Sequence, residues 1–101
     1  MTSKTAIVTG GAQGIGRAIV DHFLELGWSV AAWDKDEEAI EDLVAAHDGK
    51  PLLATHCDVG READVGAAFE ELIDWQAGEA PGFDLLVNNA GIAQPQAGPI
   101  E

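Results

Sequence analysis

Four glycines near the N-terminus have the spacing of a phosphate-binding turn. They are Gly10, Gly11, Gly14 and Gly16. The apolar run 5–9 precedes them, and an amphipathic segment that begins at Arg17 follows them. A strand that leads through a glycine-rich turn into a helix aims backbone N–H groups and the positive end of the helix dipole at an anion. The turn therefore predicts a phosphate site, and a dinucleotide diphosphate suits it best.

The glycine spacing differs from the two common phosphate-binding fingerprints. It does not follow G-x-G-x-x-G, and Arg17 stands where a P-loop with glycines at Gly11 and Gly16 needs a lysine. Gly10 and Gly16 would permit the tight turn and close helix packing, and Gly14 would let the backbone approach the phosphates. A strand-to-helix turn without a ligand is the alternative at this point.

Asp34 favours the dinucleotide. It follows the predicted strand 29–33, at about the distance from the turn where dinucleotide folds place the acid that binds the adenosine ribose. A carboxylate there repels a 2′-phosphate at about 4 Å by about 4 kcal/mol, if the effective dielectric is about 20. The residue therefore predicts NAD(H) rather than NADP(H). The alternative is that Asp34, or equally Asp36, caps the next helix.

The elements that must position these residues alternate between strand and helix patterns. The predicted strands cover 5–9, 29–33, 51–56 and 83–88. The inner side of the first helix, which Gly27 ends, is predicted from the spacing of Ile15, Ala18, Ile19, His22, Phe23 and Leu26. The second helix, which stops at Gly49, shows Ile40, Leu43, Val44 and His47 on one side, and the third shows Val65, Ala68, Phe69, Leu72 and Ile73.

The order βαβαβαβ predicts an α/β fold. We expect a Rossmann-type doubly wound parallel sheet of order 3-2-1-4, which stops after the fourth strand. Segments 77–82 and 91–101 are expected to be loops, because they are rich in glycine and proline.

Three motifs at strand ends resemble the short-chain dehydrogenase/reductase family. Segment 9–16 is similar to its T-G-x-x-x-G-I-G cofactor motif, and segment 88–91 is similar to its N-N-A-G motif. Segment 57–59, Cys-Asp-Val, resembles the part of the family that contacts adenine. Together these motifs cover essentially the whole chain.

The resemblance implies a set of cofactor-binding residues. The set is Gly10, Gln13, Gly14, Ile15, Gly16, Asp34, Asp58, Val59, Asn89, Ala90 and Gly91. Amides of the turn would meet the pyrophosphate, and Asp34 would hold the adenosine ribose. Asp58 and the Val59 amide would bind the adenine ring. Residues 89–91 would line the ribose region, while Asn88 would brace neighbouring strands. The alternatives are that Asp58 caps the third helix and that 88–89 form a turn.

The catalytic residues of that family have no counterpart here. The family uses a tyrosine, a lysine four residues later, a preceding serine and an assisting asparagine, but this chain contains no tyrosine. We therefore assign no catalytic residue. Residues 1–101 are expected to be an incomplete NAD-binding portion that is inactive alone. The parent enzyme would transfer a hydride between the nicotinamide and a small secondary alcohol or ketone, and would be a homo-oligomer.

Two other functions are consistent with the sequence. One is a non-catalytic dinucleotide-binding module, which works as it stands or pairs its open sheet edge with another chain. The other is a methyltransferase-like domain with the same strand–glycine–helix order.

Composition excludes several classes of partner. Eighteen acidic and five basic residues give a formal charge of −13, which disfavours nucleic acid and anionic membrane surfaces.

The single cysteine, Cys57, cannot form an intrachain disulfide, which fits a reducing compartment. With neither a signal-peptide pattern nor a membrane-spanning run, the chain is predicted to be cytoplasmic. His56, Cys57 and Asp58 are adjacent but predict no metal site.

Overall fold

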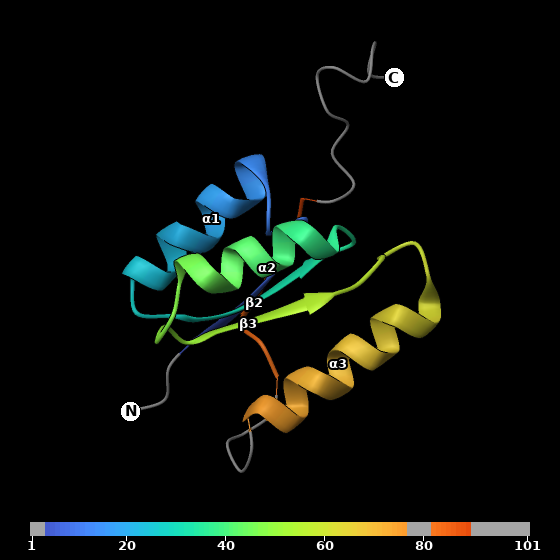
Figure 1. The fold of residues 1–101 in the computed structure, drawn as a ribbon. Coiled ribbons are helices and arrows are strands. Elements are labelled where there is room, and N and C mark those ends of the chain that lie inside the picture. Colours follow the sequence, from blue (N-terminus) through green and yellow to red (C-terminus); the bar gives the residue numbers. More distant parts are fainter. Residues whose placement is uncertain (1–3, 77–81, 90–101) are drawn as a thin grey trace, which may run out of the picture.

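The computed structural model describes residues 4–76 and 82–89, which form a four-stranded parallel sheet with helices on both faces (Figure 1). The strands are β1 Thr5–Thr9, β2 Ser29–Asp34, β3 Leu52–His56 and β4 Leu85–Asn88. The helices are α1 Gly14–Glu25, α2 Glu37–Ala46 and α3 Glu62–Gln76. The strand order is β3-β2-β1-β4, so the predicted order 3-2-1-4 is confirmed.

The two central strands are buried on both faces. Residues of β1 therefore alternate between two cores: Val8 packs with residues of α1 and α2, whereas Ile7 packs with residues of α3. Figure 1 shows α1 and α2 on one face of the sheet and α3 on the other. Trp33 of β2 also faces α3 and packs edge-on against Phe69, with ring centroids 5.0 Å apart. A strand covered on both sides needs apolar residues at every position, which explains the continuous apolar runs in β1 and β2.

Glycine and aspartate set the ends of the first two helices. Gly27, at φ 88°, follows the C-cap residue of α1, so its predicted role at the helix end is confirmed. Asp36 is the N-cap of α2, and its carboxylate accepts a hydrogen bond from the Ala39 N–H at 3.1 Å. The capping role left open between Asp34 and Asp36 therefore belongs to Asp36.

The buried side of α1 differs from the predicted one. The helix begins at Gly14 rather than at Arg17, and Gly16, Val20 and Leu24 are its buried residues. Of the residues that were predicted to be inward, Ile15 and Leu26 are 69% and 58% exposed. Ala18 and His22 are exposed as well, whereas Ile19 and Phe23 are partly buried. Two adjacent rows of residues at four-residue spacing could each face the sheet. The row that does so, Gly16, Val20 and Leu24, starts at a glycine, which adds no apolar side chain to the sequence pattern.

Smaller corrections apply elsewhere. Val44 and Ile73 are each 51% exposed, because α2 and α3 bury only the row next to them. β3 begins at Leu52, after the proline, and β4 begins at Leu85. Of the two predicted loops, only Gly82 lies within the described residues.

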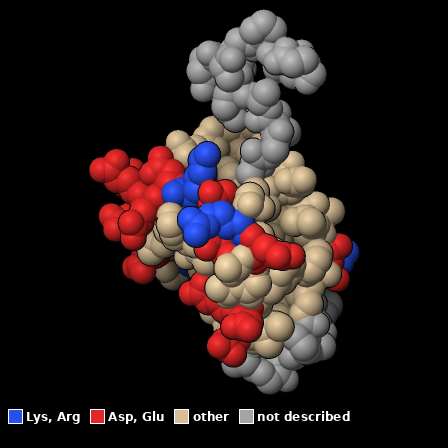
Figure 2. All heavy atoms as spheres, turned by 90° about the vertical axis from the view of Figure 1, so that its right-hand side faces the viewer, with Lys and Arg blue, Asp and Glu red and all other residues tan. Residues whose placement is uncertain are grey.

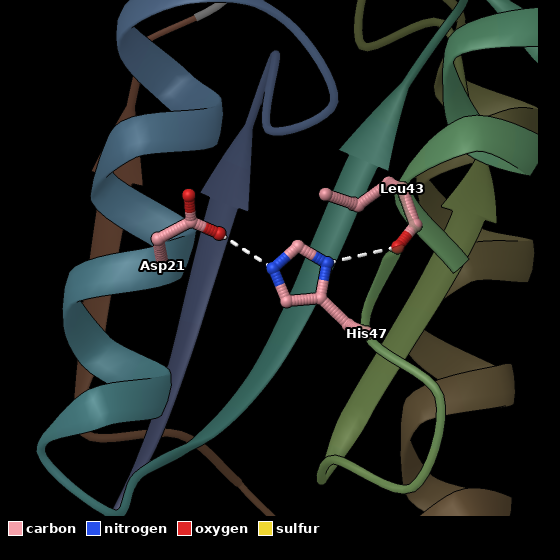
Figure 3. Close-up of polar contacts among 3 residues, drawn as sticks. All are labelled: Asp21, Leu43 and His47. Atoms are coloured by element: carbon pink, nitrogen blue, oxygen red, sulfur yellow. Dashed lines mark hydrogen bonds and ion pairs between the residues drawn. The ribbon is translucent and has the colours of Figure 1, made fainter. Parts of the chain in front are cut away.

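A histidine connects the two helices on one face of the sheet (Figure 3). His47, the C-cap residue of α2, places Nε2 2.5 Å from the Asp21 carboxylate of α1 and Nδ1 2.9 Å from the Leu43 carbonyl oxygen. The contact joins α1 to α2. Among the described residues, no helix is long and apolar enough to cross a membrane.

Candidate functional site

The glycine turn is anchored on the end of β2. The Gly10 N–H donates to the Trp33 carbonyl oxygen at 2.6 Å, and the Gly11 N–H donates to the same oxygen at 3.3 Å. Gly10 has φ 64°, a conformation that side-chain-bearing residues rarely adopt. The chain therefore bends sharply after β1 and enters α1 beside the carboxyl ends of the strands.

Glycines of the turn serve different purposes. A Cβ on Gly16 would overlap the Gly10 carbonyl oxygen and would lie 2.6 Å from Asn89 Nδ2, so only glycine fits there. A Cβ on Gly11 would lie 2.9 Å from the Val8 carbonyl oxygen. A Cβ on Gly14, which has φ 54°, would meet nothing within 4 Å, so the surroundings of this residue are open. The turn is thus tightly packed at Gly11 and Gly16, whereas the space next to Gly14 is open.

The N-terminus of α1 is available to an anion. Its N-cap residue, Gln13, makes no side-chain hydrogen bond to the helix, and the first turn contains no acidic residue. The first N–H groups of a helix have no acceptor within the helix, and the helix dipole makes this end positive. A phosphate placed here would receive backbone hydrogen bonds and favourable electrostatics.

Asp34 lies beside this helix end and is directed toward the turn. It is only 5% exposed. Its Oδ2 accepts from the Ala12 N–H at 3.1 Å, and its Oδ1 accepts from the Asp36 N–H at 3.0 Å and from Gln13 Nε2 at 3.4 Å. Ala12 was not identified from the sequence, because its contribution is a backbone N–H and its side chain carries no signal.

The residues after β3 form a second polar corner. Asp58 is half-buried, and its Oδ1 accepts from the Gly60 N–H at 2.9 Å, while its own N–H donates to Asp64 at 3.1 Å. The Asp58 side chain therefore holds the turn ahead of α3. Val59 is 40% exposed, so its surroundings are open to a ligand.

Two asparagines close the site from the side of β4. The Thr9 hydroxyl donates to Asn88 Oδ1 at 3.2 Å, and Asn89 Nδ2 donates to the Gly10 carbonyl oxygen at 3.2 Å. Both side chains thus join the end of β4 to β1 and to the glycine turn. Ala90 and Gly91 lie outside the described residues.

A polar groove of about 340 Å³ runs between the starts of α1 and α2. It is lined by Ala12, Gln13, Gly14, Arg17, Asp36, Glu38, Ala39 and Asp42. Figure 2 views the side of the molecule toward which β3 points, and it shows a few basic side chains among a larger number of acidic ones. The lining of the groove itself includes one guanidinium, of Arg17, and three carboxylates next to the N-terminus of α1.

Cys57 is not placed for reaction. It is 2% exposed in the core beneath α3. Burial, together with the charges of Asp64 and Asp58, raises the pKa of its thiol. Among residues 4–76 and 82–89, no group of histidine, cysteine and acidic side chains could hold a metal ion.

Comparison with known proteins identifies the family. The family model described as short chain dehydrogenase matches residues 4–100. The chain belongs to this family. Its sheet and glycine turn are thus those of a short chain dehydrogenase, a Rossmann-type fold that carries oxidoreductases.

Among curated short chain dehydrogenases, the L-2,3-butanediol dehydrogenase of Corynebacterium glutamicum is 44% identical over 97 residues. That match covers 91% of this chain and 36% of the relative. The 3beta-hydroxysteroid dehydrogenase 2 of Eggerthella lenta is 40% identical over 94 residues, covering 91% of this chain and 35% of the relative. The chain therefore spans about a third of the length of these relatives.

Solved structures of short chain dehydrogenases resemble the fold. A short chain dehydrogenase/reductase from Burkholderia phymatum in complex with NAD has a TM-score of 0.74 and 27% identity. The similarity covers 83% of this chain and 29% of that one. A 3-oxoacyl-reductase structure from Bacillus thuringiensis has a TM-score of 0.75 at 23% identity, covering 87% of this chain and 35% of that one, and supports the fold alone.

Proposed function

We propose that residues 1–101 are the NAD-binding portion of an incomplete short chain dehydrogenase domain. The whole enzyme transfers a hydride between the nicotinamide and a secondary alcohol or ketone, and it is a cytoplasmic homo-oligomer. The nicotinamide supplies the hydride donor or acceptor when it is bound. The residues of this chain bind and orient the dinucleotide, whereas the tyrosine and lysine that would handle the proton have no counterpart here.

Asp34 is the observation that carries the preference for NAD. Its two carboxylate oxygens accept three hydrogen bonds, from N–H groups of Ala12, Gln13 and Asp36. The hydrogen bond from Gln13 is the longest, at 3.4 Å. An ionised carboxylate has about four acceptor positions. Two ribose hydroxyls would therefore bind by displacing the exposed Gln13 side chain. A 2′-phosphate would meet this charge, and carboxylates around the groove, at close range.

The diphosphate would lie over Gly14 at the start of α1. The amides of Gln13, Gly14 and Ile15 would donate to its oxygens, supported by Gly10 and Gly16, which shape the turn. The open surroundings of Gly14 and the absence of an acid in the first turn support this position.

The adenine and nicotinamide ends would lie on either side of the turn. Asp58 would accept from the adenine amino group, and the Val59 amide would donate to a ring nitrogen. Asn89, Ala90 and Gly91 would line the second ribose. The buried Asn89 side chain, held on the Gly10 carbonyl oxygen, supports a rigid wall on that side.

The relatives support an alcohol substrate. One is named for L-2,3-butanediol and another for 2,5-dichloro-2,5-cyclohexadiene-1,4-diol, both of which are diols. The substrate of this enzyme is proposed only as a small secondary alcohol or ketone, because most of the relatives' length lies outside the match.

Calorimetric titration with NADH and NADPH tests the proposal. NADH should bind at least about tenfold more tightly than NADPH, because about 1.4 kcal/mol of repulsion already gives this ratio. Asp34→Ala should weaken NADH binding and reduce the difference between the affinities for NADH and NADPH. Equal affinity of the unchanged chain for the two cofactors would contradict the role of Asp34, and failure to bind either would contradict the dinucleotide site.

The absence of tyrosine favours one second candidate, a non-catalytic dinucleotide-binding module. The intact mass of the native protein separates the two candidates. A protein more than about twice this length, with Tyr-x-x-x-Lys beyond the matched part, supports the enzyme. A native product that ends at Glu101 supports the module.

A further inference from the structure

The carboxylate of Asp34 is engaged with the protein before any ligand arrives. Its side chain is nearly buried, and Oδ2 accepts from the Ala12 N–H at 3.1 Å in a hydrogen bond that is itself buried. Ala12 is 2% exposed and packs in the core between the sheet and α1. Without Asp34, this N–H would be a buried donor with no acceptor, an arrangement that proteins rarely tolerate.

We propose that Asp34 is a positioning residue for the glycine turn, in addition to its role at the ribose. It fixes the backbone at Ala12 so that the following amides, at 13–15, face the diphosphate. This inference rests on the proposed function, because it assigns the geometry of the same phosphate site.

Two anchors from the end of β2 hold the first half of the turn. The Trp33 carbonyl oxygen accepts from Gly10 at 2.6 Å, and the next residue, Asp34, accepts from Ala12 at 3.1 Å. Residues 10–12 are thus fixed against β2, whereas Gln13 and Gly14 are exposed. Fixing the stem of a turn while its tip stays exposed prepares the tip amides for a ligand without ordering them at the moment of binding.

A role in charge discrimination alone would have the opposite effect on anion binding. If Asp34 acted only through its negative charge, its removal would strengthen the binding of any anion at the turn. If it positions the amides, its removal weakens anion binding despite the lost repulsion. Inorganic pyrophosphate distinguishes the two roles, because it contains no ribose.

The experiment compares Asp34→Ala with Glu38→Gln in the complete chain. Glu38 lines the same groove and loses one negative charge in this variant, but the Ala12 N–H donates to Asp34 and not to Glu38. Pyrophosphate affinity is measured by calorimetry at constant salt, and exchange of the Ala12 amide with deuterium is measured by NMR without ligand. We expect Asp34→Ala to bind pyrophosphate at least about fivefold more weakly and to exchange Ala12 at least about tenfold faster. Glu38→Gln should bind pyrophosphate equally or more tightly, with unchanged exchange.

Unchanged or tighter pyrophosphate binding by Asp34→Ala would overturn the positioning role, while the dinucleotide site would stand if NADH still binds the unchanged chain. If the unchanged chain binds neither pyrophosphate nor NADH, the proposed function fails, and Ala12 exchange alone decides the positioning role. Where Asp34→Ala loses protection throughout β1, Asp34→Asn replaces it. The remaining amide oxygen can accept from either Ala12 or Asp36, so the readout in this variant is Ala12 exchange together with pyrophosphate affinity. Faster Ala12 exchange with weaker pyrophosphate binding supports the proposal, and either change without the other contradicts it.

Discussion

The carboxylate of Asp21 lies 2.5 Å from Nε2 of His47, while the other ring nitrogen of His47 faces the Leu43 carbonyl oxygen at 2.9 Å (Figure 3). Both ring nitrogens of His47 are thus in contact with oxygen atoms, one on α1 and one on α2. Because His47 is the C-cap residue of α2, its ring joins the end of this helix to the middle of α1.

Asp21→Asn should weaken the link between α1 and α2. The variant removes the carboxylate that contacts the His47 ring, and the contact lies at a partly exposed position. We expect the unfolding free energy to fall by about 0.5–1 kcal/mol, measured by urea unfolding. Asp42→Asn serves as the charge control, and an equal effect of the two substitutions would contradict the prediction.

Gly16→Ala should prevent the turn from closing. The added methyl group would overlap the Gly10 carbonyl oxygen, and backbone cannot move away as a flexible side chain does. We expect the unfolding free energy to fall by more than about 3 kcal/mol. Gly66→Ala is the matched control, because its methyl group would meet nothing within 4 Å on α3 and should raise stability by about 0.5–1 kcal/mol. Equal effects of the two substitutions in urea unfolding would refute this account of the turn.

Asp34→Ala alone should not produce a chain that prefers NADPH. Asp36, Glu38 and Asp42 still line the groove beside the turn and would repel a 2′-phosphate. We expect NADH to remain at least as tightly bound as NADPH in this variant. Adding Glu38→Gln and Asp42→Asn should bring the two affinities closer. Calorimetry at low and high salt checks the cause, because the remaining preference should shrink as salt screens the charges.

The Cys57 thiol should react slowly and should tie stability to alkaline pH. Its raised pKa and its burial reduce both the thiolate and its access, so alkylation at about pH 8 should be at least about tenfold slower than in urea. Because the pKa is higher in the folded chain than in the unfolded chain, the thiol stabilises the fold below its ordinary pKa. This contribution is lost as pH rises through the ordinary thiol pKa toward the raised pKa of the folded chain. Cys57→Ala should lose that part of the pH dependence, and an identical alkaline decline would rule out the thiol as its cause.

Much of the fold could be predicted because local patterns determine it. The buried runs of β1 and β2, the cap at Gly27 and the alternation of elements together predicted a parallel sheet whose order is confirmed. The side of α1 that faces the sheet could not be predicted in the same way. The buried row contains Gly16, and its close approach to Gly10 is a packing relationship rather than an apolar pattern.

The same distinction between sequence pattern and packing applies to the site. Asp34 could be singled out from its place after β2, since residue type and position both carry the signal. Its partner, the Ala12 N–H, could not, because every residue except proline has such a group and the contact spans 22 residues. The pair of Asp21 and His47 was missed for a related reason. Each lies on a different helix, and only the packing of α1 beside α2 brings them together.

The buried position of Trp33 affects the fluorescence of its indole ring. Its indole Nε1 is buried and meets no acceptor in the part of the chain that the structure describes, and its ring packs among apolar side chains beneath α3. An indole shielded from water in this way fluoresces at shorter wavelength than one in solvent. Since Trp33 directly precedes Asp34, the intrinsic fluorescence of this tryptophan should change when a dinucleotide binds, so binding can be followed without an added label.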